Sequence, residues 1–62
     1  MKNAKSWKNK KVLITGVCGT IGAELVRQLS QTDVEYIVGI DNSETELFFM
    51  SEQYNSVKNI DF

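Results

Sequence analysis

The chain has 62 residues, of which 42% are hydrophobic and 24% charged, and it contains four glycines and no proline. This composition excludes collagen-like, proline-rich and highly charged disordered chains. The single cysteine excludes an internal disulfide framework, and the lack of histidine excludes a Cys/His zinc site. A chain of this length buries only about 60% of its unfolded surface, so we expect a marginal domain or the opening part of a longer one.

The net charge of −1 conceals an uneven distribution of charge along the chain. Five lysines and no acid occur in residues 1–23, whereas all eight acids lie in residues 24–62 with only Arg27 and Lys58. We interpret residues 1–10 as a solvated basic arm that protects the apolar strand after it. Binding to nucleic acid or to an anionic membrane is the alternative, and it is disfavoured because the lysines form no helical face or repeated motif.

A basic start followed by apolar residues resembles a secretory signal, but the apolar run here covers only Val12 to Ile14. A signal core needs about 7–15 apolar residues, and a membrane span needs about 20. Thr15 and Gly16 end the run, and two further glycines follow by residue 22. We therefore expect a cytoplasmic segment without a membrane span.

The first half of the remaining chain predicts a strand and then a helix. Residues 11–15 form a β-branched-rich run that ends at a glycine, as a buried parallel strand does. Residues 20–31 have the apolar spacing of an amphipathic helix. The stripe that we expect to face the sheet consists of Ile21, Leu25 and Leu29, with Val26 beside it.

The second half repeats this order. Residues 34–40 are rich in Val, Ile and Tyr and predict a second strand that ends before Asp41. Ser43 and Glu46 have capping-box spacing, in which the hydroxyl accepts from the Glu46 amide and the carboxylate accepts from the Ser43 amide. A helix over residues 44–54 should follow, and its segment Phe48-Phe49-Met50 should lie in the core, because a second helix must cover the sheet.

Residues 57–62 have the pattern of a third strand that is only beginning. The order β-α-β-α-β predicts an α/β fold, namely the N-terminal portion of a Rossmann-type parallel sheet with right-handed crossovers, truncated in its last element. Because both crossovers step in one direction, the two helices should cover the same face of the sheet.

Three glycines, each three residues apart, separate the first predicted strand from the first predicted helix. Gly16 permits a tight turn, Gly19 removes a side chain that would block a phosphate, and Gly22 lets the helix pack closely on the strand. The amides around Thr20 and Ile21 would then face an anion at the positive end of the helix dipole. This pattern predicts a pyrophosphate cradle.

Closely spaced glycines also occur in triphosphate P-loops and in tight turns that bind no ligand. A P-loop is excluded because Ala23 and Glu24, and not Lys and Ser/Thr, follow the last glycine. Asp41 argues against a turn without a ligand. This acid follows the second predicted strand nineteen residues beyond Gly22, where a carboxylate accepts both hydroxyls of an adenosine ribose. We therefore predict dinucleotide binding.

The spacing Gly-x-x-Gly-x-x-Gly after Thr15 resembles the extended short-chain dehydrogenase/reductase superfamily. Within it, Gly-Thr-Ile-Gly-Ala-Glu-Leu-Val-Arg-Gln (residues 19–28) and Asp-Asn-Ser-Glu (residues 41–44) look most like the nucleotide-sugar 4,6-dehydratases and epimerases of bacterial polysaccharide biosynthesis, the CapD-like group. The resemblance covers residues 9–62. It implies that Asp41 holds the adenosine ribose, with Asn42 and Ser43 near the adenine side. The residues that it implies for the pyrophosphate are Gly16, Gly19, Thr20, Ile21 and Gly22.

The cofactor expected from these residues is NAD, with NADP as the alternative. Asp41 would repel a 2′-phosphate, and no Arg or Lys lies between Arg27 and Lys58 to neutralise one. NADP stays open because Ser43 can donate to a phosphate.

Cys18 replaces the small residue usual in the family, and we expect it to fill space in the loop and not to act as a redox thiol.

The resemblance implies a Tyr-x-x-x-Lys catalytic pair on a later helix. Tyr54 and Lys58 have that spacing but lie in the second predicted helix and the turn after it, so we assign no catalytic residue. We expect residues 11–62 to be the NAD(P)-binding Rossmann segment of a dehydratase (lyase) or epimerase. Such an enzyme oxidises a nucleotide sugar at C4. We expect the full-length parent to be a homo-oligomer. The alternative is a non-catalytic dinucleotide-binding module or an inactive gene fragment.

Overall fold

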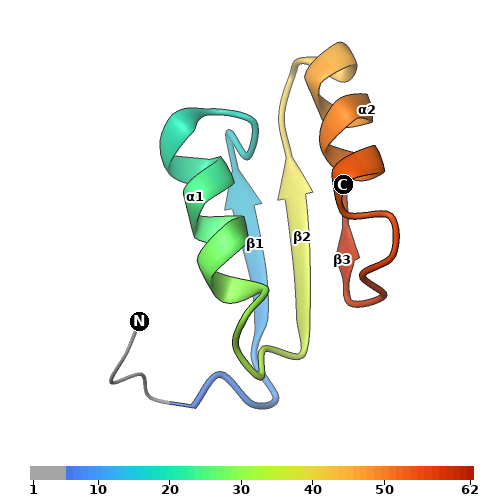
Figure 1. The fold of residues 1–62 in the computed structure, drawn as a ribbon. Coiled ribbons are helices and arrows are strands. Elements are labelled where there is room, and N and C mark those ends of the chain that lie inside the picture. The colour runs from blue at the N-terminus through green and yellow to red at the C-terminus, as the bar shows by residue number, and fades with distance from the viewer. Residues whose placement is uncertain (1–5) are drawn as a thin grey trace.

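The structure, a computed structural model, describes residues 6–62 and consists of a three-stranded sheet and two helices (Figure 1). This arrangement confirms the predicted α/β class and the N-terminal portion of a Rossmann-type sheet. The elements in chain order are β1 (Lys11–Thr15), α1 (Thr20–Leu29), β2 (Tyr36–Ile40), α2 (Glu44–Gln53) and β3 (Ile60–Asp61). Both helices and the last two strands are shorter than the sequence predicts, by one to four residues each.

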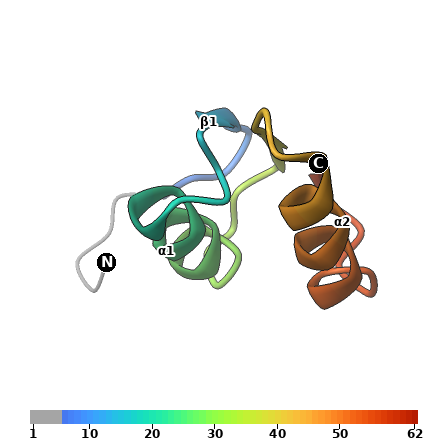
Figure 2. The same ribbon diagram turned by 90° about the horizontal axis from the view of Figure 1, so that it is seen from above.

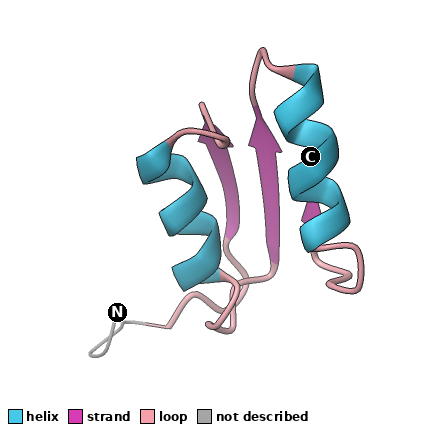
Figure 3. Cartoon of the chain, turned by 45° about the horizontal axis from the view of Figure 1, so that its top comes forward, coloured by secondary structure: helices cyan, strands magenta, loops and turns pink. Residues whose placement is uncertain are grey.

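The strands lie in the order β1-β2-β3 and run parallel. β1 and β2 pair along their whole length, from Lys11 opposite Tyr36 to Thr15 opposite Ile40. β3 adds only two paired residues at the other side of β2. Because the ends of β1 and β2 are in register, the segments that follow them leave the same edge of the sheet side by side (Figure 3).

Both helices lie on one face of the sheet, as two right-handed crossovers in one direction require (Figure 2). The core lies between that face and the helices, whereas Leu13 and Ile40 on the opposite face are 62% and 47% exposed. Neither helix is long and apolar enough to cross a membrane, and the described part of the chain has no other. The buried hydrophobic residues are Ile14, Val17, Val26, Leu29, Val34 and Ile37.

The inner face of α1 differs from the predicted stripe. Gly22, Val26 and Leu29 are buried, whereas Ile21 and Leu25 are exposed. The helix presents Gly22 to the sheet because the backbone of the preceding turn lies against that position. A side chain there would push the helix away, so the glycine sets the rotation of α1 more strongly than the apolar spacing does.

The prediction that Phe48 and Phe49 lie in the core is wrong. These side chains are 60% and 64% exposed, and their rings form an edge-to-face pair with centroids 5.6 Å apart. Leu47 and Met50 of α2 pack against the core together with Tyr54 at the C-cap, and all three are only partly buried. α2 covers the side of the sheet where β3 has two residues, so there is little surface for more of its apolar side chains.

The described part of the predicted basic arm is attached to the fold. Asp33, in the turn between α1 and β2, accepts hydrogen bonds from the Ser6 hydroxyl and the Trp7 amide, both at 2.8 Å. The Trp7 side chain is partly buried against the core. Residues 1–5, with two of the arm's lysines, lie outside the described residues.

Candidate functional site

The turn between β1 and α1 begins with a glycine in a left-handed conformation. Gly16 has φ +61°, a region that side-chain-bearing residues rarely adopt. The Gly19 amide donates to the Gly16 carbonyl oxygen at 3.0 Å and closes the turn, and the Val17 amide donates to the Ile40 carbonyl oxygen at 3.1 Å. The predicted role of Gly16 in a tight turn is therefore confirmed.

The other two glycines of the motif lie against the backbone of this turn. A Cβ atom on Gly22 would lie 2.5 Å from the Gly16 carbonyl oxygen and 2.8 Å from the Val17 Cα, so only glycine permits the observed packing. This confirms the predicted close approach of the helix. A Cβ atom on Gly19 would lie 3.3 Å from the same oxygen, so Gly19 is also restricted by the turn itself.

The amino-terminal end of α1 is open to solvent. Gly19 is its N-cap and provides no side-chain oxygen, and the first intrahelical hydrogen bond runs from the Ala23 amide to the Gly19 carbonyl at 2.9 Å. No acid lies in the first turn, and Thr20 and Ile21 are exposed. The helix dipole and the first amides thus face outward, as an anion site requires.

Asp41 follows β2 and links the glycine turn to α2. Its Oδ2 atom accepts a hydrogen bond from the Cys18 amide, and its Oδ1 atom accepts one from the Ser43 amide, both at 3.0 Å. These amides, first that of Ser43 and then that of Cys18, lower the pKa of the Asp41 carboxyl below its ordinary value. The group is therefore an anion at neutral pH, half-buried beside the turn.

Ser43 forms only half of the predicted capping box. Its hydroxyl accepts a hydrogen bond from the Glu46 amide at 3.4 Å and caps α2, as predicted. The Ser43 amide donates to Asp41 and not to the Glu46 carboxylate, so that half of the prediction is wrong. Asp41 takes the place of the glutamate because it lies two residues before the N-cap, within reach of this amide.

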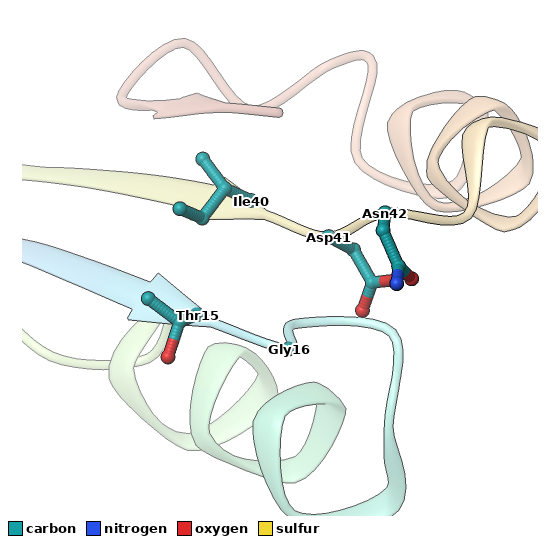
Figure 4. A pocket seen from close by; sticks show the side chains of 5 residues that line it. All are labelled: Thr15, Gly16, Ile40, Asp41 and Asn42. Carbon is teal, nitrogen blue, oxygen red and sulfur yellow. The ribbon is translucent and has the colours of Figure 1, made fainter.

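A hollow of about 410 Å³ opens at the edge of the sheet where β1 and β2 end. The Asp41 and Asn42 side chains point from the end of β2 toward the glycine turn (Figure 4). Among the predicted site residues, the structure brings Gly16, Asp41 and Asn42 to this hollow, whereas Ser43 caps the adjoining helix. The residues that line the hollow are Thr15, Gly16, Ile40, Asp41 and Asn42, and none of them is basic.

Cys18 lies on the α2 side of the turn and is half-buried. Burial raises the pKa of its thiol, and the negative charges of Asp41 and Glu46 raise it further. A protonated thiol is a poor nucleophile, which agrees with the expectation that Cys18 fills space in the loop.

Arg27 and Lys58, the basic residues nearest to Asp41 in the sequence, do not line the hollow. Arg27 lies in the last turn of α1 and forms two hydrogen bonds with the carboxylate of Glu24, from Nε at 2.9 Å and from the terminal nitrogen at 2.5 Å. Lys58 precedes β3 and so lies at the opposite edge of the parallel sheet. Tyr54 follows the last residue of α2 and so lies toward that same edge, with its ring centroid 5.9 Å from that of Phe62.

Two features of the site do not follow from the spacing rules applied to the sequence. The first is the hydrogen bond between the Cys18 amide and Asp41, which no such rule indicates. The second is Gly39 in β2, where a Cβ atom would lie 2.7 Å from a methyl group of Val17 and 2.8 Å from the Phe62 ring. A glycine inside an otherwise β-branched strand is the signal that could have revealed this close approach.

A parallel β-α-β-α-β unit with a glycine turn after its first strand and an acid after its second defines the opening of a Rossmann-type domain. Residues 12–62 match the family described as polysaccharide biosynthesis protein, and the chain belongs to this family. This match confirms the resemblance to the CapD-like group.

A curated relative is described as an uncharacterized membrane protein of Methanocaldococcus jannaschii. It is 38% identical over 52 residues, which make up 84% of this chain and 16% of the relative. The chain therefore spans about one sixth of the length of the curated relative that it matches.

Proposed function

We propose that residues 11–62 bind the adenosine and pyrophosphate parts of NAD, as the first segment of a nucleotide-sugar 4,6-dehydratase or epimerase. The observation that carries the proposal is the position of the Asp41 carboxylate beside the glycine turn, at the mouth of the hollow between the ends of β1 and β2. Ligands of open parallel sheets bind outside the carboxyl ends of the strands, which is where this hollow lies.

Different groups of the chain would bind the pyrophosphate and the adenosine of the dinucleotide. The exposed first turn of α1 offers the amides of Thr20 and Ile21 to a pyrophosphate, and Gly19 leaves the approach free of a side chain. Asp41 would accept the hydroxyls of the adenosine ribose, because each of its oxygens accepts one amide in the chain and has a further lone pair. Asn42 lines the same hollow and would contact the adenosine.

Two features favour NAD over NADP. A 2′-phosphate would lie beside the anionic Asp41, and the lining of the hollow contains no basic side chain to neutralise it. Ser43, the group that left NADP open, already donates its amide to Asp41, and its hydroxyl caps α2. Bound NAD would accept a hydride from C4 of the sugar, the chemistry that dehydratases and epimerases share.

Calorimetry of the chain with NAD, NADP and ADP-ribose tests the binding. We expect NAD and ADP-ribose to bind with similar affinity and NADP to bind more weakly. Gly19→Val should abolish binding, because the branched side chain would enter the pyrophosphate position. Gln31→Val, an equally β-branched change at an exposed position after α1, is the matched control and should leave affinity unchanged. A folded Gly19→Val variant with the affinity of the original chain would contradict the proposal.

Activity is tested in a catalytically active member of the family whose matching segment is exchanged for residues 12–62. Formation of a 4-keto sugar from nucleotide sugars should persist in the exchanged protein and disappear when it carries Gly19→Val. An exchanged protein that binds NAD but forms no keto sugar, although its fold is intact, would favour the non-catalytic binding module.

A further inference from the structure

The Asp41 carboxylate forms two hydrogen bonds within the chain itself. One oxygen accepts the Cys18 amide from the glycine turn, and the other accepts the Ser43 amide from the N-cap of α2. The two donors are 25 residues apart in the sequence, one in the turn after β1 and the other at the N-cap of α2. A single side chain therefore connects both segments that flank the hollow.

The Cys18 amide has no equivalent partner in the backbone of the turn. Its neighbours on both sides are satisfied by main-chain oxygens, since the Val17 amide donates to Ile40 and the Gly19 amide donates to Gly16. Cys18 is half-buried, so water could replace the carboxylate as a partner of its amide only in part. Loss of the carboxylate would therefore leave this donor poorly satisfied, which costs free energy. The position of this central residue of the turn thus depends on Asp41.

We propose that Asp41 is a positioning residue for the nucleotide site, which holds the glycine turn through the Cys18 amide and the start of α2 through the Ser43 amide before any ligand binds. The inference rests on the proposed function for the identity of the ligand, whereas the two contacts belong to the ligand-free chain. A ribose diol would then meet a carboxylate that is already oriented, so less conformational freedom is lost on binding.

The charge of Asp41 is held by amides and not by a cation. The hydrogen bonds that lower its pKa come from main-chain amides, and the titratable groups around the contact, namely the Cys18 thiol and the Glu46 carboxylate whose charge acts on that thiol, are not positive. The positive end of α2 adds to the amides, since Asp41 lies two residues before its N-cap. Protonation of Asp41 should therefore release both segments together, without competition from a neighbouring ion pair.

The test is nuclear magnetic resonance of the 62-residue chain, with an osmolyte present to favour the compact state. In the original chain, the Cys18 and Ser43 amide shifts should titrate together with the Asp41 carboxyl carbon, with a pKa below that of an unfolded aspartate. In Asp41→Asn, hydrogen exchange at one of the two bonded amides, that of Cys18 or that of Ser43, should accelerate about tenfold or more relative to the Val17 amide, because the nitrogen that replaces one carboxylate oxygen cannot accept. Asp33→Asn, the same change at an aspartate that contacts Ser6 and Trp7 instead, is the matched control and should leave exchange at Cys18 and Ser43 unchanged.

Each outcome decides the matter. Protection that is equal in the original chain and in Asp41→Asn at both the Cys18 and the Ser43 amides overturns the inference, and so does a Cys18 amide that does not titrate with Asp41 or that exchanges freely in the original chain. If Asp41→Asn unfolds, the titration of the original chain decides alone. Coupled titration without NAD binding would leave the positioning role intact and refute the proposed function, whereas NAD binding without coupled titration would do the reverse.

Discussion

Gly22 packs directly on the backbone of Gly16, since a Cβ atom on Gly22 would lie 2.5 Å from the Gly16 carbonyl oxygen. The same carbonyl accepts the Gly19 amide, so all three glycines of the motif meet at one peptide group. This contact fixes both the closure of the turn and the rotation of α1. The amino-terminal end of α1 is therefore placed by backbone packing and not by side-chain contacts.

Gly22→Ala should destabilise the chain, although alanine favours helices by about 1 kcal/mol over glycine. The added methyl group would meet backbone atoms of Gly16 and Val17, which cannot move aside as a flexible side chain can. Overpacking of this kind costs about 1–3 kcal/mol, so we expect a net loss of free energy of unfolding. Urea unfolding followed by circular dichroism measures it. A more stable Gly22→Ala variant would show that α1 does not pack as described.

Substitutions in the core and on the exposed side of α2 should differ in their effect on the free energy of unfolding. Ile37 is fully buried, and Ile37→Ala should lower the free energy of unfolding by about 2–5 kcal/mol. Phe48→Ser and Phe49→Ser remove side chains that are more than half exposed, so they should change it little and should reduce self-association. Sedimentation and urea unfolding of the three variants provide the comparison. A phenylalanine variant as unstable as Ile37→Ala would place that ring in the core.

The attachment of the amino-terminal segment should depend on pH through Asp33. Hydrogen bonds from the Ser6 hydroxyl and then from the Trp7 amide lower the pKa of the Asp33 carboxyl. The folded pKa is therefore below the unfolded value of about 3.9, so the stabilisation is complete above that pH and is lost as the pH falls through the folded pKa. Trp7 fluorescence should shift to longer wavelength over this acid range.

Asp33→Asn supplies the control for that titration. Its Trp7 emission should already resemble that of the acidified original chain near neutral pH, and it should change less on acidification. Glu24, whose pKa the Arg27 hydrogen bonds lower to about 2, accepts its hydrogen bonds from Arg27 and Gln28 of the same helix and not from Trp7. Emission that is identical in both proteins at every pH would show that Asp33 does not hold the segment.

The order of elements was predictable because it depends on short-range periodicity. The β-branched runs before Gly16 and Asp41 and the four-residue spacing in α1 are local features, and the parallel topology follows from their alternation. The rotation of α1 was not predictable from its apolar stripe, because Gly22 has no side chain to count and yet determines which face can approach the turn.

In the candidate site, too, the positions that follow from local sequence patterns were predictable, and the contacts between distant residues were not. The sequence predicted that Gly16 and Asp41 lie at one edge, because both follow parallel strands. It could not indicate that Asp41 takes the Ser43 amide from Glu46, since two acids compete for one donor and only their three-dimensional positions decide. The exposure of Phe48 and Phe49 was missed for a related reason, because adjacent aromatic residues on a helix point in different directions and define no single face.

Cofactor preference should respond to the charge at the end of β2. Asp41→Ala combined with Asn42→Arg removes the anion that would repel a 2′-phosphate and adds a guanidinium to the lining of the same hollow. We expect the ratio of NADP to NAD affinity, measured by calorimetry, to rise. Asp41→Ala alone should weaken NAD binding, because it removes the ribose acceptor and frees the Cys18 and Ser43 amides, and it should reduce the preference for NAD without reversing it, because no basic partner for the phosphate is added. Asn42→Arg alone should leave NAD preferred, since Asp41 would still face the phosphate. If the original chain already binds NADP more tightly than NAD, the electrostatic role assigned to Asp41 is wrong.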